Sequence, residues 1–213
     1  AKAESQPAAE KLLFDIGVSE PRGGLAARLL EVPDLPALDL TLTGDGPLTN
    51  WAARLELALD GRTTVTGSAR IEEANAQRRL TFDLDGDLAP LAPPAAQAFL
   101  LGTTNASGSA RFTDAFLPLA ADVTVKTETV SLDAKADLED DNANITAGIA
   151  VSAGSGALIA LDIDDRRIAF GPLNAKIVIS GKRDAADWSV DAGLASFSTA
   201  ELKTEAIRLT GSG

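Results

Sequence analysis

The chain has 213 residues and a formal net charge of −12, and it contains no cysteine, histidine or methionine. This acidic balance argues against nucleic acid as a partner, because phosphates require lysine and arginine, and against adhesion to anionic membrane surfaces. Without cysteine and histidine the chain lacks thiolates, disulfides, and the commonest general base and metal ligand. Because methionine is absent, we expect a fragment or a processed chain. No stretch has the length of a membrane span or the pattern of a signal peptide.

Residues 1–23 are expected to form a flexible N-terminal segment. Their first half is small, polar and charged, and a short first strand is predicted at 12–18. A brief helix is predicted at 25–30, after a Pro-Arg-Gly-Gly interruption. Pro33 and Pro36 end this helix, because proline lacks the backbone N–H that a helix interior needs.

From Leu38 onward, apolar and polar residues alternate in one run after another, as in Leu38-Asp39-Leu40-Thr41-Leu42. Successive side chains of a strand point to opposite faces, so each run predicts a strand with one apolar and one polar face. The runs follow one another too closely for parallel crossover helices, which favours antiparallel hairpins. The strands are predicted at 38–43, 51–60, 63–71, 79–88, 104–113, 118–128, 130–138, 144–152, 157–164, 174–181, 188–195 and 205–211.

A second short helix is predicted at 93–102, where prolines stand at the start and a glycine at the end. It could cap one end of the sheet. The predicted fold class is therefore all-β and mostly antiparallel, with one or two short helices. We expect 24–213 to form a single elongated domain, with 24–113 and 114–213 as candidate sub-units.

The apolar members of the predicted strands form the candidate functional surface. Aromatic residues make up only 4% of the chain, so this surface consists mainly of small aliphatic side chains. In a curved sheet it would line a groove, whereas in a β-sandwich two halves of the sheet would cover each other and leave no space for a ligand. The predicted lining residues are Leu38, Leu40, Leu42, Leu55, Leu57, Leu59, Val65, Ile71, Leu80, Phe82, Leu84, Val123, Val125, Val130, Leu132, Ile145, Ile149, Val151, Ile177 and Ile179.

Few residues suggest a catalytic or metal-binding site. Asp83-Leu84-Asp85-Gly86-Asp87 resembles part of a calcium loop but lacks the downstream glutamate, and the alternation already explains its aspartates as outward-facing. We therefore predict no catalytic residue, no metal ligand and no cofactor. Trp51 and Trp188 stand near strand starts, where each either packs as a plug on the apolar face or lies at the rim of a ligand channel.

Several stretches together resemble a known family. They are, in chain order, the helix 25–30, Pro33-Asp34-Leu35-Pro36, Leu38 to Trp51, Leu55-Glu56-Leu57 and Ala206 to Gly211. They are similar to segments of the TamB family, the AsmA-like translocation and assembly module proteins of the Gram-negative envelope. The resemblance runs over most of 24–211 and is most specific at 38–59.

The resemblance implies a fold and a function. Strands of this family form a half-pipe, the β-taco, with an apolar interior. Its members are anchored in the inner membrane and cross the periplasm, and they are implicated in phospholipid transport and in the assembly of outer-membrane barrel proteins. The implied function is a non-enzymatic periplasmic segment that shields phospholipid acyl chains and works with an outer-membrane barrel protein of the same module. The alternatives are a scaffold that pairs with barrel strands by β-augmentation, a closed β-sandwich, and a calcium-dependent or carbohydrate-active β-domain.

Overall fold

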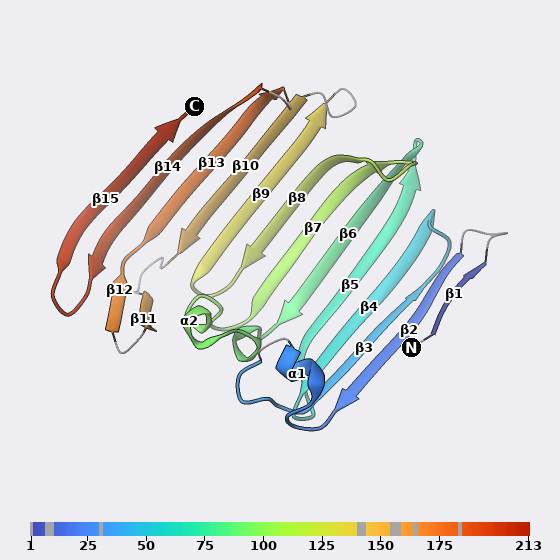
Figure 1. Ribbon diagram of the computed structural model, residues 1–213. Coiled ribbons are helices and arrows are strands. Elements are labelled where there is room, and N and C mark those ends of the chain that lie inside the picture. The colour runs from blue at the N-terminus through green and yellow to red at the C-terminus, as the bar shows by residue number, and fades with distance from the viewer. Residues whose placement is uncertain are drawn as a thin grey trace.

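A computed structural model describes residues 2–6, 11–29, 32–139, 144–153, 159–163, 166–182 and 185–213. The described residues form one antiparallel sheet of 15 strands with very little helix (Figure 1). This confirms the predicted all-β, antiparallel fold class. Whether the sheet closes into a half-pipe stays a prediction.

The strands follow the chain order with few exceptions. Neighbours pair from β1 through β10, and the sheet then continues through β13 and β14 to β12 and β11, while β15 pairs with β14. The strands are β1 (Lys2–Gln6), β2 (Lys11–Glu20), β3 (Leu38–Asp45), β4 (Asn50–Leu59), β5 (Arg62–Ala74), β6 (Gln77–Gly86), β7 (Thr104–Thr113), β8 (Pro118–Lys126), β9 (Val130–Glu139), β10 (Asn144–Ala153), β11 (Ile159–Ile163), β12 (Arg166–Phe170), β13 (Leu173–Lys182), β14 (Ala185–Ser198) and β15 (Lys203–Ser212).

Short turns join several of the neighbouring strands. Asp60 and Gly61 connect β4 to β5 with φ values of 48° and 75°. Asn75 and Ala76 connect β5 to β6 with φ values of 56° and 57°. Positive φ at both central residues matches the right-handed twist of the flanking strands and so closes a tight hairpin.

The helical elements are short and lie together at one end of the sheet (Figure 1). They are α1 (Leu25–Leu29), the 3-10 turn η1 (Ala89–Leu91) and α2 (Pro94–Gln97). The predicted helix at 93–102 is thus much shorter than expected. We call this end of the strands the helix end. The opposite end, where the β5–β6 and β7–β8 hairpins turn, we call the hairpin end.

The strand predicted at 12–18 is confirmed as β2, which pairs with β3 from Phe14 to Glu20. β1 pairs with β2 and is absent from the predicted strands, because the alternation in this region is short. β12 is also absent from the predicted strands. It starts with Arg166 and Arg167, which hide its apolar pattern, and it pairs with β11 along its whole length.

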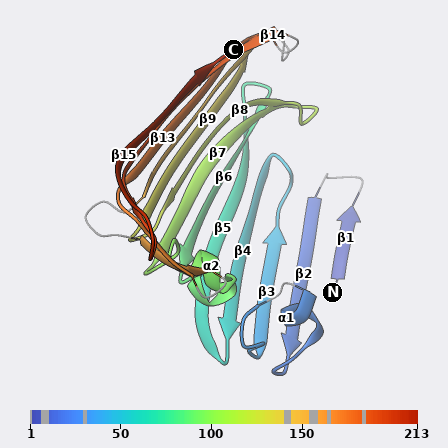
Figure 2. The same cartoon turned by 60° about the vertical axis from the view of Figure 1, so that its left-hand side comes forward.

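The sheet is a single layer. Strands contact their ladder neighbours, and no second sheet packs on either face of the described part of the chain (Figures 1 and 2). The accessible surface of 13475 Å² is far above the value of about 9,300 Å² for a compact monomer of this mass. The closed β-sandwich is therefore wrong for the described residues.

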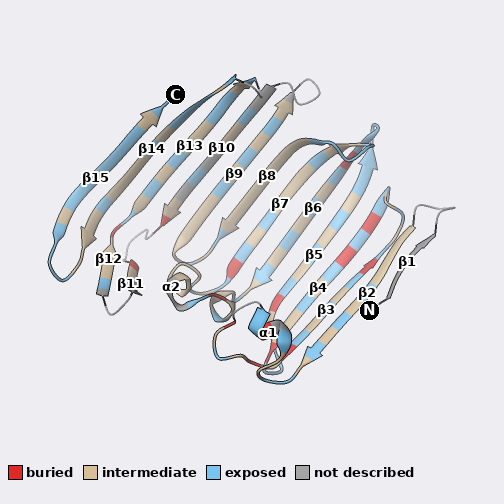
Figure 3. Cartoon of the chain, viewed as in Figure 1, coloured by how far each residue is buried: buried red, intermediate tan, exposed pale blue. Residues whose placement is uncertain are grey.

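Buried residues gather mainly near the helix end and not along the middle of the sheet (Figure 3). Ala27 of α1 and Val32 just after it are buried together with residues at the ends of β3 and β4. Thr104, where the segment after α2 enters β7, is fully buried. The covering segments therefore bury one end of the sheet, and a smaller buried group, which includes Trp51, Ala53 and Arg78, lies toward the hairpin end.

Candidate functional site

Strand register places every predicted lining residue on one face of the sheet, which we call the apolar face. Leu42 lies opposite Leu55, and Val125 lies opposite Leu132. One row of directly opposed residues crosses the sheet without a polar side chain: Ile16, Leu42, Leu55, Gly67, Leu84, Ala106, Val125, Leu132, Val151, Ala175, Ala192 and Leu209. The apolar face is thus continuous from β2 to β15.

Not all of the predicted lining residues are accessible. Leu38, Leu59 and Val65 are only 3%, 8% and 3% exposed, so they belong to the small core and not to the open surface. Most of the others are half-buried, and Ile179 is more exposed. Ile145, Ile149 and Val151 occupy apolar-face positions by register, and their side chains lie outside what the structure describes.

Aromatic rings on the apolar face lie across glycines of neighbouring strands. A Cβ built on Gly44 would come within 2.6 Å of Phe14 and 2.7 Å of Trp51, whose ring centroids are 5.4 Å apart. A Cβ built on Gly108 would come within 2.7 Å of the Phe82 ring. The glycines give the rings room against the backbone, so the rings occupy space that a side chain would otherwise fill.

The two tryptophans differ in their surroundings. Trp51 is 8% exposed and packs against Phe14, as expected of a plug on the apolar face. Trp188 is 46% exposed and lies over Gly211 of the edge strand β15, at 3.3 Å from a Cβ built there. Of the two, only Trp188 presents an accessible indole on the apolar face.

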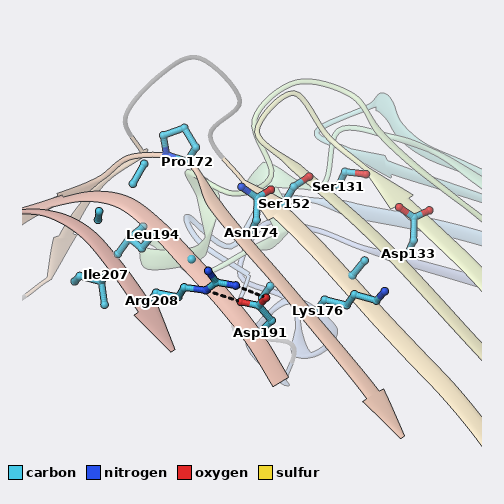
Figure 4. A pocket seen from close by; sticks show the side chains of 15 residues that line it. Ser131, Asp133, Ser152, Pro172, Asn174, Lys176, Asp191, Leu194, Ile207 and Arg208 are labelled. Atoms are coloured by element: carbon cyan, nitrogen blue, oxygen red, sulfur yellow. Dashed lines mark hydrogen bonds and ion pairs between the residues drawn. The ribbon is translucent and has the colours of Figure 1, made fainter. Parts of the chain in front are cut away.

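The apolar face is shallow. A hollow of about 150 Å³ on it is lined by side chains from β3 to β6, including Leu42, Leu55, Phe82 and Leu84. Larger hollows lie on the opposite, polar face. One of about 690 Å³ is lined by Ser131, Asp133, Asn174, Lys176, Asp191 and Arg208 among others (Figure 4).

The polar face is held by ion pairs between neighbouring strands. Arg208 donates two hydrogen bonds to Asp191, and Lys135 lies 2.9 Å from Asp122. These carboxylates raise the pKa values of Arg208 and Lys135 above their usual range. Among the described residues no acidic cluster could hold a metal ion, and Asp85 of the calcium-like stretch accepts a hydrogen bond from Asn105. These ion pairs of the polar face are therefore exposed to solvent and link neighbouring strands.

An ion pair ties the α1 segment to the helix end. Arg22 donates hydrogen bonds to both carboxylate oxygens of Asp60, and the backbone N–H of Ala37 donates to the same carboxylate at 3.1 Å. The hydrogen bond from Arg22, followed by that from Ala37, lowers the pKa of Asp60 below its usual value of 3.8. The same pair raises the pKa of Arg22.

This pair predicts a pH-dependent contribution to stability. Because folding lowers the pKa of Asp60, its contribution is present above pH 3.8 and disappears as the pH falls below that value. We expect Asp60→Asn to lower the melting temperature at pH 7 and to have no effect once wild-type Asp60 is protonated. Thermal unfolding measured across this pH range checks the prediction. Arg22→Gln should match Asp60→Asn, and additive effects in the double variant would contradict the pairing.

Two threonines fix the segment around α2 on the sheet. Thr129 donates its hydroxyl toward the carbonyls of Ala98 and Phe99, at 3.1 Å and 2.9 Å. Thr127 donates to the Phe99 carbonyl at 2.9 Å and accepts from the N–H of Val130 at 2.8 Å. The Phe99 ring also lies 5.9 Å from that of Phe170 in β12. The loop before β9 thus holds α2 at the helix end.

Removing one of these hydroxyls should loosen the helix end. Thr129→Val keeps the shape of the side chain but removes the donor to the Ala98 carbonyl and one of the two hydroxyls that bond the Phe99 carbonyl, at a cost of about 1 kcal/mol. We expect faster hydrogen exchange and proteolysis in 93–102, with little change elsewhere. Thr124→Val removes an exposed hydroxyl that bonds Asp133 and serves as the control. Equal exchange in both variants would contradict the assigned role.

At the hairpin end, a basic side chain lies on the apolar face. Arg78 is 9% exposed and its Nε lies 3.5 Å from the Glu73 carboxylate. Its guanidinium lies 4.3 Å from the centroid of the Phe116 ring, which in turn contacts Phe112. Arg78 was not among the predicted site residues, because the strand was predicted to start at residue 79. The signal was present, since Arg78 shares the spacing of Leu80.

Comparisons with family models, with curated proteins and with solved structures find no match to this chain. Within the described ranges, no helix combines the length and apolarity needed to cross a membrane. The resemblance to the TamB family therefore rests on the sequence stretches that suggested it.

Proposed function

We propose that the apolar face shields the acyl chains of a phospholipid from water. A phospholipid carries about 30 acyl CH₂ groups, and at about 0.8 kcal/mol each their transfer into water costs on the order of 25 kcal/mol. A protein surface that covers much of this hydrocarbon lowers the barrier to moving the lipid between membranes. The protein needs no reactive group for this, so the proposed function is non-enzymatic.

The observation that carries the proposal is the uninterrupted apolar row from β2 to β15 in a sheet that no second layer covers. Contiguous apolar surfaces of this extent are rare on soluble monomers and mark sites that bind protein or lipid. Along this row, the small aliphatic side chains and the rings packed across neighbouring glycines give a smooth surface without a polar side chain. On the other face, paired charges favour contact with water.

The proposal includes a cellular setting that follows from the family resemblance. The chain would be part of a longer, inner-membrane-anchored protein in the periplasm, and its lipid would travel toward the outer membrane. An outer-membrane barrel protein of the same assembly module would receive the lipid or be assembled with it.

The edge strand β15 favours a second candidate function. Its outer edge has no strand partner among the described residues, and Leu209 on its apolar face is 64% exposed. An extended segment of a barrel protein could add to this edge by backbone hydrogen bonds, as in β-augmentation. This candidate predicts binding of peptides at β15 and not of lipid across the sheet.

Mass spectrometry of material that copurifies with the protein tests both candidates. The acyl-shielding proposal predicts phospholipids bound after purification without detergent, and their loss when the apolar face is made polar. Bound peptide in place of lipid would favour the scaffold. A protein that carries neither, even after incubation with phospholipid vesicles, would contradict acyl shielding.

A further inference from the structure

We propose that Arg78 binds the phosphate of the phospholipid, so that the lipid lies along β6 with its head at the hairpin end. This inference rests on the proposed acyl-shielding function and adds a head-group site to it. The site consists of Arg78, Glu73 and the Phe116 ring.

Strand register supports this placement. Arg78 lies opposite Glu73 of β5 and Phe112 of β7, in the row next to Ile71, Leu80 and Ala110. The same face of β6 then continues through Phe82 and Leu84, both half-buried and apolar. A cation thus lies at the hairpin end of the open apolar stretch of β6, as an amphiphile with a charged head requires.

The length of the apolar stretch fits one acyl chain. Leu80 to Gly86 spans about 20 Å at about 3.3 Å per residue. One acyl chain needs about 15 Å, half the thickness of a bilayer's hydrocarbon core. Beyond Gly86 the chain turns into η1 and α2, which occupy the helix end. A lipid with its tail toward these elements therefore places its phosphate near Arg78.

The surroundings of Arg78 suit an exchange of anions. Its ion pair with Glu73 measures 3.5 Å, whereas the exposed pair between Arg208 and Asp191 measures 2.9 Å. A phosphate offers more acceptor oxygens than Glu73 and matches the planar fork of a guanidinium. Because Arg78 is nearly buried, its hydrogen bonds would form in a water-poor setting where they are stronger. Phe116 is 42% exposed and covers the guanidinium, so it must move when the phosphate enters.

The test compares two ligands with the same acyl chains, dioctanoyl phosphatidate and dioctanoylglycerol, by titration of tryptophan fluorescence. We expect wild type to prefer phosphatidate, and Arg78→Gln to weaken phosphatidate binding about tenfold while leaving dioctanoylglycerol unchanged. Glu73→Gln removes the competing carboxylate and should strengthen phosphatidate binding several-fold, an effect that a purely structural role of Arg78 does not predict. Arg79→Gln changes the next side chain, on the polar face, and should leave both ligands unaffected.

The opposite outcomes are distinct. If Arg78→Gln lowers the affinity for both ligands equally and Glu73→Gln does not raise the affinity for phosphatidate, Arg78 is a structural residue. This result would overturn the head-group site alone. Inorganic phosphate that binds as tightly as phosphatidate would overturn the lipid assignment of this site. Failure of wild type to bind either lipid would overturn the proposed function and this inference with it.

Discussion

Phe82→Glu should abolish lipid binding and lower stability. Phe82 lies in the middle of the apolar face, half-buried, and its ring packs across Gly108. Glutamate removes this contact and places a charge where acyl chains are proposed to lie. From the lost apolar burial we expect the free energy of unfolding to fall by about 2 kcal/mol. Lipid content by mass spectrometry and the midpoint of urea unfolding measure the two effects.

Thr81→Glu is the matched control, because Thr81 is the preceding residue on β6 and is exposed on the polar face. It introduces the same charge at nearly the same place in the sequence. We expect it to retain lipid and to unfold close to wild type. Equal lipid content in the two variants would mean that lipid does not contact the apolar face of β6.

Gly108→Ala should destabilise the sheet at its centre. The new Cβ would lie 2.6 Å from the Asp122 carbonyl oxygen and 2.7 Å from Phe82. The ring can turn away, but the carbonyl belongs to the backbone of β8 and cannot move without disturbing the ladder. Overpacking of this kind costs about 1–3 kcal/mol. Urea unfolding, with its slope unchanged, would report this loss directly.

Gly148→Ala provides the comparison. Gly148 lies in β10, and the nearest atom to a Cβ built there is the Ile177 carbonyl oxygen at 3.9 Å. The substitution meets no close atom and reduces the freedom of the unfolded chain, so we expect it to be neutral or to stabilise by up to about 1 kcal/mol. Similar losses for both variants would contradict the assigned packing of Phe82 over Gly108.

Alternation was sufficient to predict most of the strands and the face to which their apolar residues point. In Leu55-Glu56-Leu57, the two-residue period of a strand places both leucines on one face of the sheet. Register then aligns Leu55 with Leu42 and Leu57 with Leu40. The continuity of the apolar face follows from this alignment, because a one-residue slip would turn every leucine to the other face. The shared face of the predicted leucines, isoleucines and valines could therefore be predicted from the sequence.

The number of layers could not be predicted in this way. A β-sandwich and an open sheet show the same alternation along each strand, and only contacts between strands distant in sequence separate them. Burial at the helix end could not be predicted from alternation either. Leu38, Leu59 and Val65 follow the lining pattern, but the fold buries them. Such burial depends on where covering segments pack, which local pattern does not encode.

Tertiary contacts also override local sequence preference in the segment around α2 and at the start of β6. The predicted helix at 93–102 shortens to α2, and hydroxyls of Thr127 and Thr129 bond the carbonyls of Ala98 and Phe99 that a longer helix would use. Arg78 breaks the apolar pattern at the start of β6, where a charged residue is ordinarily assigned to the turn. The contacts of Arg78 with Glu73 and Phe116 form because two hairpins bring these residues together, so they follow only from the fold.

Site-specific photo-crosslinking tests the central claim most directly. A benzophenone side chain is placed at Leu57, Phe82 and Val125 on the apolar face, and at the preceding residues Glu56, Thr81 and Thr124 on the polar face. Each variant is incubated with phospholipid vesicles, irradiated and examined for covalently attached lipid. Acyl shielding by the apolar face predicts lipid adducts at 57, 82 and 125 and almost none at 56, 81 and 124. Equal labelling of the two faces, or none on either, would contradict it.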